Sequence, residues 1–211
     1  MRFADLDCVT VDAYGTLVAL DDPVPALADG LRRHGATRSR DEIAAAFGVE
    51  IEYYRAHSLE GRDDASLARL RRDCCGVFLA SLGIGLDPEE LLPDFLASLR
   101  FRAEPGAIEA LRLLRSRGLA LAVVSNWDCS LEQRLEETGL LGLFDCVAAS
   151  AVVGVAKPDP RIFRYALEQL SVAPARSLHI GDSEDDRVGA ASSGMGFAWA
   201  PLGTALTELS A

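Results

Sequence analysis

The chain has 211 residues, of which 49% are hydrophobic and 25% are charged, and its formal net charge is −11 at pH 7. This composition supports a packed core, and the negative charge disfavours nucleic acid or an anionic membrane surface as the main partner. No apolar run approaches the roughly 18 residues that cross a bilayer, so we expect no membrane partner. Five cysteines without metal-ligand spacing favour reduced thiols and a cytoplasmic location.

Short apolar runs alternate with helical patterns along much of the chain. Runs typical of buried strands lie at 7–12, 119–125, 145–150, 177–182 and 196–200. Apolar residues at helical spacing predict helices at 107–117, 129–138, 160–171 and 184–193. Continuously apolar strands that alternate with helices indicate an α/β fold, in which a doubly wound parallel sheet is covered on both faces.

The stretch 17–100 differs from the rest of the chain. It contains helical patterns near 24–34, 40–57, 64–83 and 88–98, and no convincing strand. Asp22-Pro23 and Pro105-Gly106 provide boundary signals on either side of these patterns. We therefore predict a core domain formed by 1–16 and 101–211, with an all-helical domain inserted at 17–100.

Polar residues follow four of the predicted strands, at the edge where open parallel sheets bind ligands. They are Asp12, then Ser125 and Asn126, then Lys157 in the loop after the third strand, and Asp182 and Asp186 after the fourth. Helix capping would explain any one of them, but hardly the whole set. Lys157 is the only lysine among the 21 lysines and arginines, which suggests that this position requires a compact ammonium group.

Four segments that contain these residues have a recognisable order. VDAYGTLV, VVSNWD, KPDPRIF and HIGDSEDDRVGA resemble the four motifs of the haloacid dehalogenase-like (HAD) hydrolase superfamily. A helical cap inserted after the first motif is also similar to members of this superfamily, whose core is Rossmann-like. The resemblance implies that Asp12 is the nucleophile, that Ser125 hydrogen-bonds the transferring group, and that Lys157 neutralises negative charge.

The resemblance also implies a magnesium site and substrate contacts. The expected Mg²⁺ ligands are the carboxylates of Asp12, Asp182 and Asp186 and the backbone carbonyl of Tyr14. Mg²⁺ prefers such hard oxygen ligands, and a carboxylate that attacks a phosphate dianion needs cations to offset the repulsion. The residues expected to contact a small-molecule substrate are Tyr14, Thr16 and Asn126.

Tyr14 departs from the phosphatase pattern, because HAD phosphatases usually carry a second aspartate two residues after the nucleophile. A phenol, which keeps its proton near neutral pH, is a poor general base, so substrates with good leaving groups should be favoured. The sequence Asp-Ala-Tyr-Gly-Thr instead resembles the first motif of L-2-haloacid dehalogenases, whose chemistry needs no metal. Those enzymes carry uncharged polar residues where this chain has Asp182, and the acids Asp12, Asp182, Asp185 and Asp186 together favour a metal.

These observations predict a Mg²⁺-dependent, phosphatase-like hydrolase that acts on a small phosphorylated metabolite. A metal-independent 2-haloacid dehalogenase is the main alternative, and a non-catalytic HAD-fold protein that binds a phosphorylated ligand is another. His34, His57 and His179 have no partners at ligand spacing, so we expect core or surface roles for them. The sequence leaves the substrate and the oligomeric state open.

Overall fold

The structure is a computed structural model in which residues 3–210 are described. The chain divides into two compact units. The α/β unit contains Met1–Ala19 and Phe101–Ala211, and the helical unit contains Leu20–Arg100. The helical unit spans most of the stretch for which the sequence predicts an inserted cap, and its action as a cap stays a prediction.

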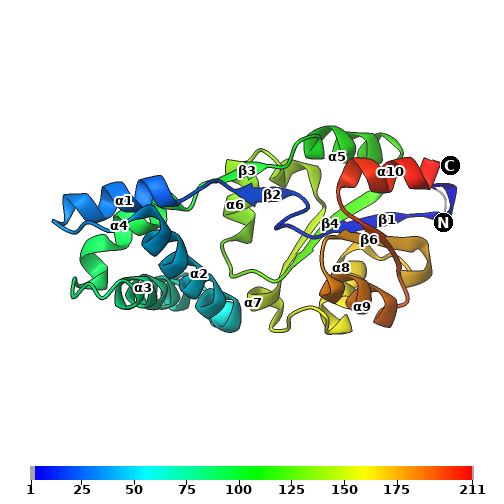
Figure 1. Cartoon of the computed structure of the whole chain (residues 1–211). Coiled ribbons are helices and arrows are strands. Elements are labelled where there is room, and N and C mark those ends of the chain that lie inside the picture. Colours follow the sequence, from blue (N-terminus) through cyan, green and yellow to red (C-terminus); the bar gives the residue numbers. More distant parts are fainter. Residues whose placement is uncertain (1–2, 211) are drawn as a thin grey trace. The chain divides into compact units, whose positions relative to one another are not determined.

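The α/β unit is built on a five-stranded parallel sheet with the order β5-β4-β1-β6-β7 (Figure 1). The strands are β1 Cys8–Val11, β4 Ala120–Ser125, β5 Cys146–Ala149, β6 Ser177–Gly181 and β7 Gly196–Trp199. The central strand β1 pairs Val9 with Leu121 of β4 on one side and with Leu178 of β6 on the other. The predicted fold class, a doubly wound parallel sheet, is confirmed.

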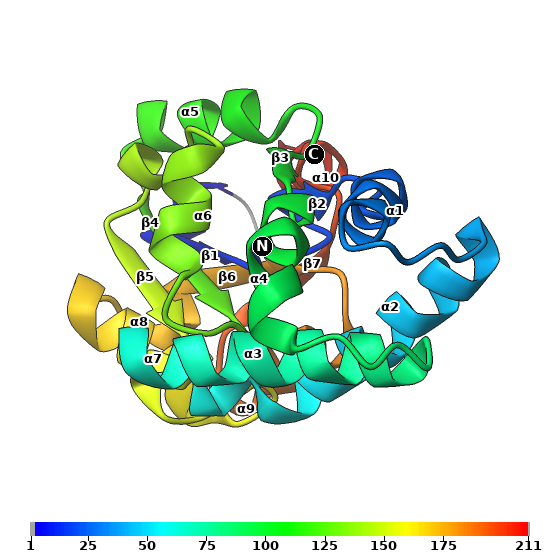
Figure 2. The ribbon, with the colours of Figure 1, turned by 90° about the vertical axis from the view of Figure 1, so that its left-hand side faces the viewer.

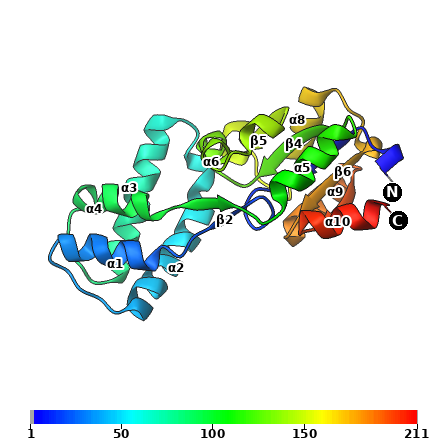
Figure 3. The same cartoon turned by 90° about the horizontal axis from the view of Figure 1, so that it is seen from above.

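Helices cover both faces of this sheet. One face carries α5 Ala107–Ser116, α6 Leu131–Glu137 and α10 Leu202–Ser210, and the other carries α8 Pro160–Leu170 and α9 Glu184–Ser192. Because side chains alternate along a strand, Val11 of β1 packs in the first layer and Cys8 packs in the second. Helices α5 and α10 also contact each other, as the view from above shows (Figure 3).

The sequence specifies α8 and α9 through local signals. Helix α8 starts where Asp159 accepts a hydrogen bond from the amide of Arg161, and Pro160 occupies its first turn. Helix α9 starts at a capping box between Ser183 and Asp186. A Cβ atom at Gly189 of α9 would collide with the ring of Phe163 in α8, so glycine at this position permits the two helices to pack closely.

The helical unit has its own apolar core. Its helices are α1 Val24–Arg33, α2 Arg40–His57, α3 Asp64–Ser81 and α4 Pro88–Ser98. Helices α2 and α3 pack against each other (Figure 2). The tilted rings of Phe78 and Phe95, 5.6 Å apart, join α3 to α4. The core buries Leu27, Ile43 and Leu91 almost completely, which is why these four helices form a compact unit.

The prediction that 17–100 contains no strand is wrong at its first residues. Strand β2, Val18–Leu20, pairs with β3, Phe101–Ala103, in a separate two-stranded sheet. Three residues are too few to establish an alternating pattern, and the pairing partner lies about eighty residues away in sequence. The short helix α7, Ser150–Val153, and helix α10 were also not predicted. Within residues 3–210 there are four 3₁₀ turns, at Phe3–Asp5, Ser58–Glu60, Leu141–Leu143 and Pro174–Arg176.

Two further findings concern membrane-spanning helices and the cysteines. Among the described residues, no helix has both the length and the apolar character that a bilayer crossing requires. No disulfide bond joins Cys8, Cys74, Cys75, Cys129 and Cys146, all of which lie within the described residues.

Candidate active site

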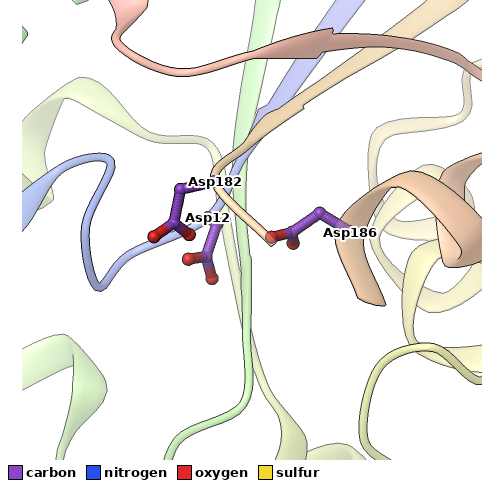
Figure 4. A group of neighbouring side chains, drawn as sticks. All are labelled: Asp12, Asp182 and Asp186. Atoms are coloured by element: carbon purple, nitrogen blue, oxygen red, sulfur yellow. The ribbon is translucent and has the colours of Figure 1, made fainter. Parts of the chain in front are cut away.

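Three aspartates of the α/β unit converge at the carboxyl edge of the parallel sheet (Figure 4). Asp12 directly follows β1, Asp182 directly follows β6, and Asp186 lies in the first turn of α9. One carboxylate oxygen from each lies within 4.8 Å of the others. Asp12 and Asp186 are buried, whereas Asp182 is exposed, so the group is open to solvent on the side of Asp182.

The carboxylate of Asp12 is held through one of its oxygens. Oδ1 accepts hydrogen bonds from Lys157 Nζ at 2.5 Å and from Ser125 Oγ at 2.9 Å. The backbone amide of Asp12 donates to the carbonyl of Ile180, which continues the pairing of β1 with β6. Among the hydrogen bonds described, Oδ2 of Asp12 takes part in none.

Lys157 bridges two of the aspartates. Its Nζ donates to Asp186 Oδ1 at 2.6 Å as well as to Asp12 Oδ1, and the side chain is only 3% exposed. The loop that carries Lys157 is fixed by Asn126, whose side chain accepts from the Lys157 amide at 2.7 Å and donates to the Lys157 carbonyl at 3.1 Å. Asn126, predicted to contact substrate, is thus seen to anchor the lysine loop.

Asp186 has two additional partners besides Lys157. His179 Nε2 lies 2.9 Å from Oδ1, and Ser183 donates to Oδ2 through its hydroxyl at 2.5 Å and its amide at 3.1 Å. A Cβ atom at Gly181 would collide with the Asp186 carboxyl group, so the glycine before Asp182 makes room for this side chain. The Gly-Asp-Ser sequence therefore has a packing reason as well as a chemical one.

Asp182 lies against the loop that follows β1. A Cβ atom at Gly15 would collide with Asp182 Oδ2, and Gly15 also has a φ of +81°, which only glycine adopts without strain. The amide of Gly15 donates to the carbonyl of Val18, and the amides of Leu17 and Val18 both donate to Ala13, which closes a tight turn. This turn brings the backbone at Gly15 beside Asp182.

The electrostatic balance of the site is uneven. Burial opposes the charge on Lys157, but the carboxylates of Asp12 and Asp186 outweigh that effect and raise its pKa. Burial also works against the ionised form of Asp186, yet His179 and Lys157 hold the pKa of this carboxyl well below its ordinary value. Asp182 has its pKa raised, first by partial burial and then by the negative charges of Asp12 and Asp186. Three carboxylates thus face one ammonium group.

Tyr14 and Thr16, the other residues predicted to contact substrate, differ in their exposure to solvent. The side chain of Tyr14 is 46% exposed, and its backbone forms an isolated bridge with Val18. Thr16 is buried, and among the described side chains its Oγ1 is a buried polar atom without a hydrogen-bond partner. Asp185, which the sequence analysis counted with the other acids, is exposed on α9 and lies outside the group of three.

Sequence reasoning missed the buried residues behind Asp186. His179 and Thr10 are paired neighbours on β6 and β1, and Thr10 Oγ1 lies 2.7 Å from His179 Nδ1. The available signal was a polar side chain in the middle of each otherwise apolar strand. Such a residue needs a buried partner, and for His179 the partners are Thr10 and Asp186.

The donor set fits a hard divalent cation. Asp12 and Asp182 offer carboxylate oxygens, and the site carries more negative than positive charge. Partial burial and then the neighbouring carboxylates raise the pKa of Asp182. Glycine at position 15 keeps the backbone close to Asp182 without a side chain in between. A cation among these oxygens would relieve their repulsion.

Comparisons with known proteins identify the family to which the chain belongs. Residues 6–194 match a family model described as "haloacid dehalogenase-like hydrolase". The chain is 48% identical, over 108 residues, to haloacid dehalogenase-like hydrolase domain-containing protein 3 of Bos taurus. That match covers 51% of this chain and only 43% of the relative's length.

Two other similar proteins match along nearly the whole chain. The (S)-2-haloacid dehalogenase H-109 of Pseudomonas putida is 27% identical over 92% of this chain and 85% of its own length. A crystal structure of a HAD phosphatase from Thermococcus onnurineus is 30% identical, with a TM-score of 0.59, over 92% of this chain and 86% of that one. Because the family model matches most of the chain, the protein belongs to the haloacid dehalogenase-like hydrolase family.

Proposed function

We propose that this hydrolase removes the phosphoryl group from a small phosphorylated metabolite, with Asp12 as nucleophile and Mg²⁺ as cofactor. The observation that carries the proposal is Asp182, whose carboxylate lies within 4.8 Å of those of Asp12 and Asp186. Attack by a carboxylate on a carbon bearing halide would not need this additional negative charge. Phosphoryl transfer beside a bound cation makes use of it.

Each residue of the site has its own role in the proposed reaction. Asp12 Oδ2 attacks phosphorus while the bond to the leaving oxygen breaks, and that oxygen departs with the electron pair. Water then attacks phosphorus, which releases inorganic phosphate and restores Asp12. Lys157 and Ser125 hold Asp12 Oδ1, so the carboxylate keeps one orientation through both steps. When bound, Mg²⁺ would be held by Asp12, Asp182 and the Tyr14 carbonyl and would neutralise charge on the phosphoryl oxygens. Asp186, the other expected ligand, lies beside them with both of its oxygens hydrogen-bonded within the protein.

Tyr14 restricts this proposal to some phosphate esters. A half-exposed phenol does not supply the carboxyl group that would protonate a leaving alkoxide. Substrates whose leaving oxygen is already a weak base, such as aryl or acyl phosphates, should therefore react fastest. We also propose a cytoplasmic location, because five cysteines without metal-ligand spacing suit a reducing compartment.

A second candidate function is hydrolytic dehalogenation of 2-haloacids. Tyr14 favours it, because the phenol can form a pocket wall and no leaving-group proton is needed. The similarity to the Pseudomonas putida dehalogenase over most of both chains supports it too. In this reaction Asp12 would attack the carbon, halide would leave with the bonding electrons, and water would then hydrolyse the ester.

Turnover of 4-nitrophenyl phosphate with and without Mg²⁺ tests the proposal, alongside chloride release from L-2-chloropropionate in the presence of a chelator. We expect Mg²⁺-dependent phosphatase activity that Asp182→Asn removes and Asp185→Asn keeps, since Asp185 is an exposed neighbour outside the group. Mg²⁺ should also raise the melting temperature of wild type and Asp185→Asn, and not that of Asp182→Asn. Chloride release without metal, together with no nitrophenol release, would select the dehalogenase instead.

A further inference from the structure

His179 is a fully buried imidazole in the middle of β6, and it makes polar contacts with both ring nitrogens. Its ring also meets Phe163 edge-on at 4.9 Å and lies 6.4 Å from the ring of Phe197. Apolar contacts of this kind would be satisfied by leucine or phenylalanine. The two polar contacts therefore need a separate explanation.

The direction of these hydrogen bonds follows from the partners. An ionised carboxylate can only accept, so the hydrogen on His179 lies on Nε2 and points to Asp186 Oδ1. In the neutral ring, Nδ1 then accepts from the Thr10 hydroxyl, which β1 holds directly opposite in register. The strand pairing thereby fixes the orientation of the imidazole, and the imidazole fixes one oxygen of Asp186.

The carboxylate of Asp186 is occupied on both oxygens. Oδ1 accepts from Lys157 and His179, and Oδ2 accepts from the Ser183 hydroxyl and amide. Two donors on each oxygen satisfy the usual capacity of a carboxylate. His179 and Ser183, at the start of α9, therefore fix the orientation of the Asp186 carboxylate. The carboxylate in turn fixes the position of Lys157 Nζ in the site.

We propose that His179 is a positioning residue, which orients Asp186 so that Lys157 Nζ is held at Asp12 Oδ1. The chain of contacts runs from Thr10 through His179, Asp186 and Lys157 to Asp12, and all five side chains are buried. The effect on turnover rests on the proposed function, whereas the effect on the position of Lys157 does not.

Lys157 offers a direct readout because it is the only lysine in the chain. Protein grown with lysine labelled with ¹³C at Cε gives one side-chain lysine signal by NMR. We expect His179→Leu to shift and broaden this signal. Phe197→Leu is the matched control, since it removes a ring packed near His179 without removing a hydrogen bond. The control should leave the lysine signal in place.

Kinetics with 4-nitrophenyl phosphate provide the second readout. Loss of a hydrogen bond to a charged group predicts a fall in kcat of about 10- to 100-fold for His179→Leu, with KM changed by less than about threefold. His179→Gln, whose amide can still donate toward Asp186, should recover a large part of kcat. Phe197→Leu should keep kcat near the wild-type value even if its melting temperature falls.

Thr10→Val provides a second test in case the His179 variants misfold, because it removes only the hydroxyl that orients the ring. We expect a smaller shift of the Lys157 signal in the same direction. Identical lysine signals and kcat values in His179→Leu, Thr10→Val and Phe197→Leu would overturn the inference and leave His179 as a packing residue. If the wild type hydrolyses no phosphate ester while His179→Leu still shifts the lysine signal, the proposed function fails and the positioning role holds.

Discussion

Each of the two units buries a carboxyl group, and the pKa values of these two groups are shifted in opposite directions. In the α/β unit Asp186 is buried among Lys157, His179 and Ser183, and its pKa is lowered. In the helical unit Glu50 of α2 is 5% exposed, and burial, only partly opposed by a hydrogen bond from Cys74, raises its pKa to about 7. Burial alone therefore favours the neutral acid, and only positioned donors and a cation keep a buried acid charged.

This contrast separates two uses of a buried acid. The charge of Asp186 stabilises the ammonium group beside the nucleophile, so its environment belongs to the chemistry of the site. Glu50 lies in an apolar core beside Cys74 and Cys75, where an ionised carboxylate is unfavourable. Substitutions that exchange or remove the compensating groups should expose the difference.

The largest effect is expected where the cation is removed. Lys157→Met leaves Asp12 and Asp186 facing each other in a buried site, and we expect the free energy of unfolding at pH 7 to fall by about 3–5 kcal/mol. Urea denaturation followed by tryptophan fluorescence measures this, because Trp127 and Trp199 both lie in the α/β unit. Lys157→Arg should keep more of the stability and still lose most activity, since a guanidinium group does not fit between the two oxygens. A Lys157→Met protein as stable as wild type would contradict the view that the Lys157 ammonium group compensates the charges of Asp12 and Asp186.

In the helical unit, the ionised form of Glu50 is expected to lower the stability of the fold. The folded unit holds its proton up to pH about 7, whereas an ordinary glutamate in the unfolded chain releases it near pH 4.5. Glu50 therefore binds more protons in the folded than in the unfolded chain between these values, so its own contribution to stability is greatest below pH 4.5 and falls as pH rises toward 7. The loss amounts to at most about 3 kcal/mol.

Amide hydrogen exchange of α2 and α3 checks this expectation at matched pH. Glu50→Gln should exchange more slowly than wild type at pH 8 and equally at pH 4, because its side chain carries no charge to bury. Glu52→Gln changes an exposed carboxyl on the same helix and should behave like wild type. Equal exchange in wild type and Glu50→Gln at pH 8 would show that the carboxyl is already compensated.

Tyr14→Asp adds a carboxyl group where the α/β unit has an exposed phenol. If the site is a phosphatase that lacks a general acid, turnover of alkyl phosphates should rise by up to about 10²-fold, and the dependence on leaving-group pKa should flatten. Tyr14→Phe, which keeps the ring without the hydroxyl, should leave both properties unchanged. A rise in kcat for Tyr14→Phe equal to that for Tyr14→Asp would point to pocket shape instead of proton transfer.

The smallest effect compares two capping boxes, one in each unit. Ser183 caps α9 with Asp186 as its partner, and Ser39 caps α2 with Glu42 as its partner. Each serine-to-alanine change should cost about 1 kcal/mol of stability, measured by urea denaturation. Only Ser183→Ala should also lower kcat, because only that cap orients a residue which contacts Lys157. Equal kcat values in the two variants would limit Ser183 to a helix-capping role.

Local patterns were sufficient for much of the fold. The apolar runs at 119–125 and 177–182 and the Asp159-Pro160 start of α8 each depend on residues close together in sequence, and the strands and helix formed there. Strands β2 and β3 could not be predicted this way, because three residues carry no periodicity and their partners are distant. The assignment of the helical unit as a cap, and the roles of Asp12, Ser125, Lys157 and Asp182, stay proposals.

The sequence by itself determined which polar residues reach the carboxyl edge of the sheet, because parallel strands all end there and each strand end is visible as a local pattern. The tertiary structure decided which of these residues touch. It placed Asn126 on the Lys157 backbone and His179 behind Asp186, and it separated Asp185 from the other acids. Side-chain direction and burial depend on contacts between distant segments. For the same reason two buried carboxyl groups, Asp186 and Glu50, have pKa shifts of opposite sign.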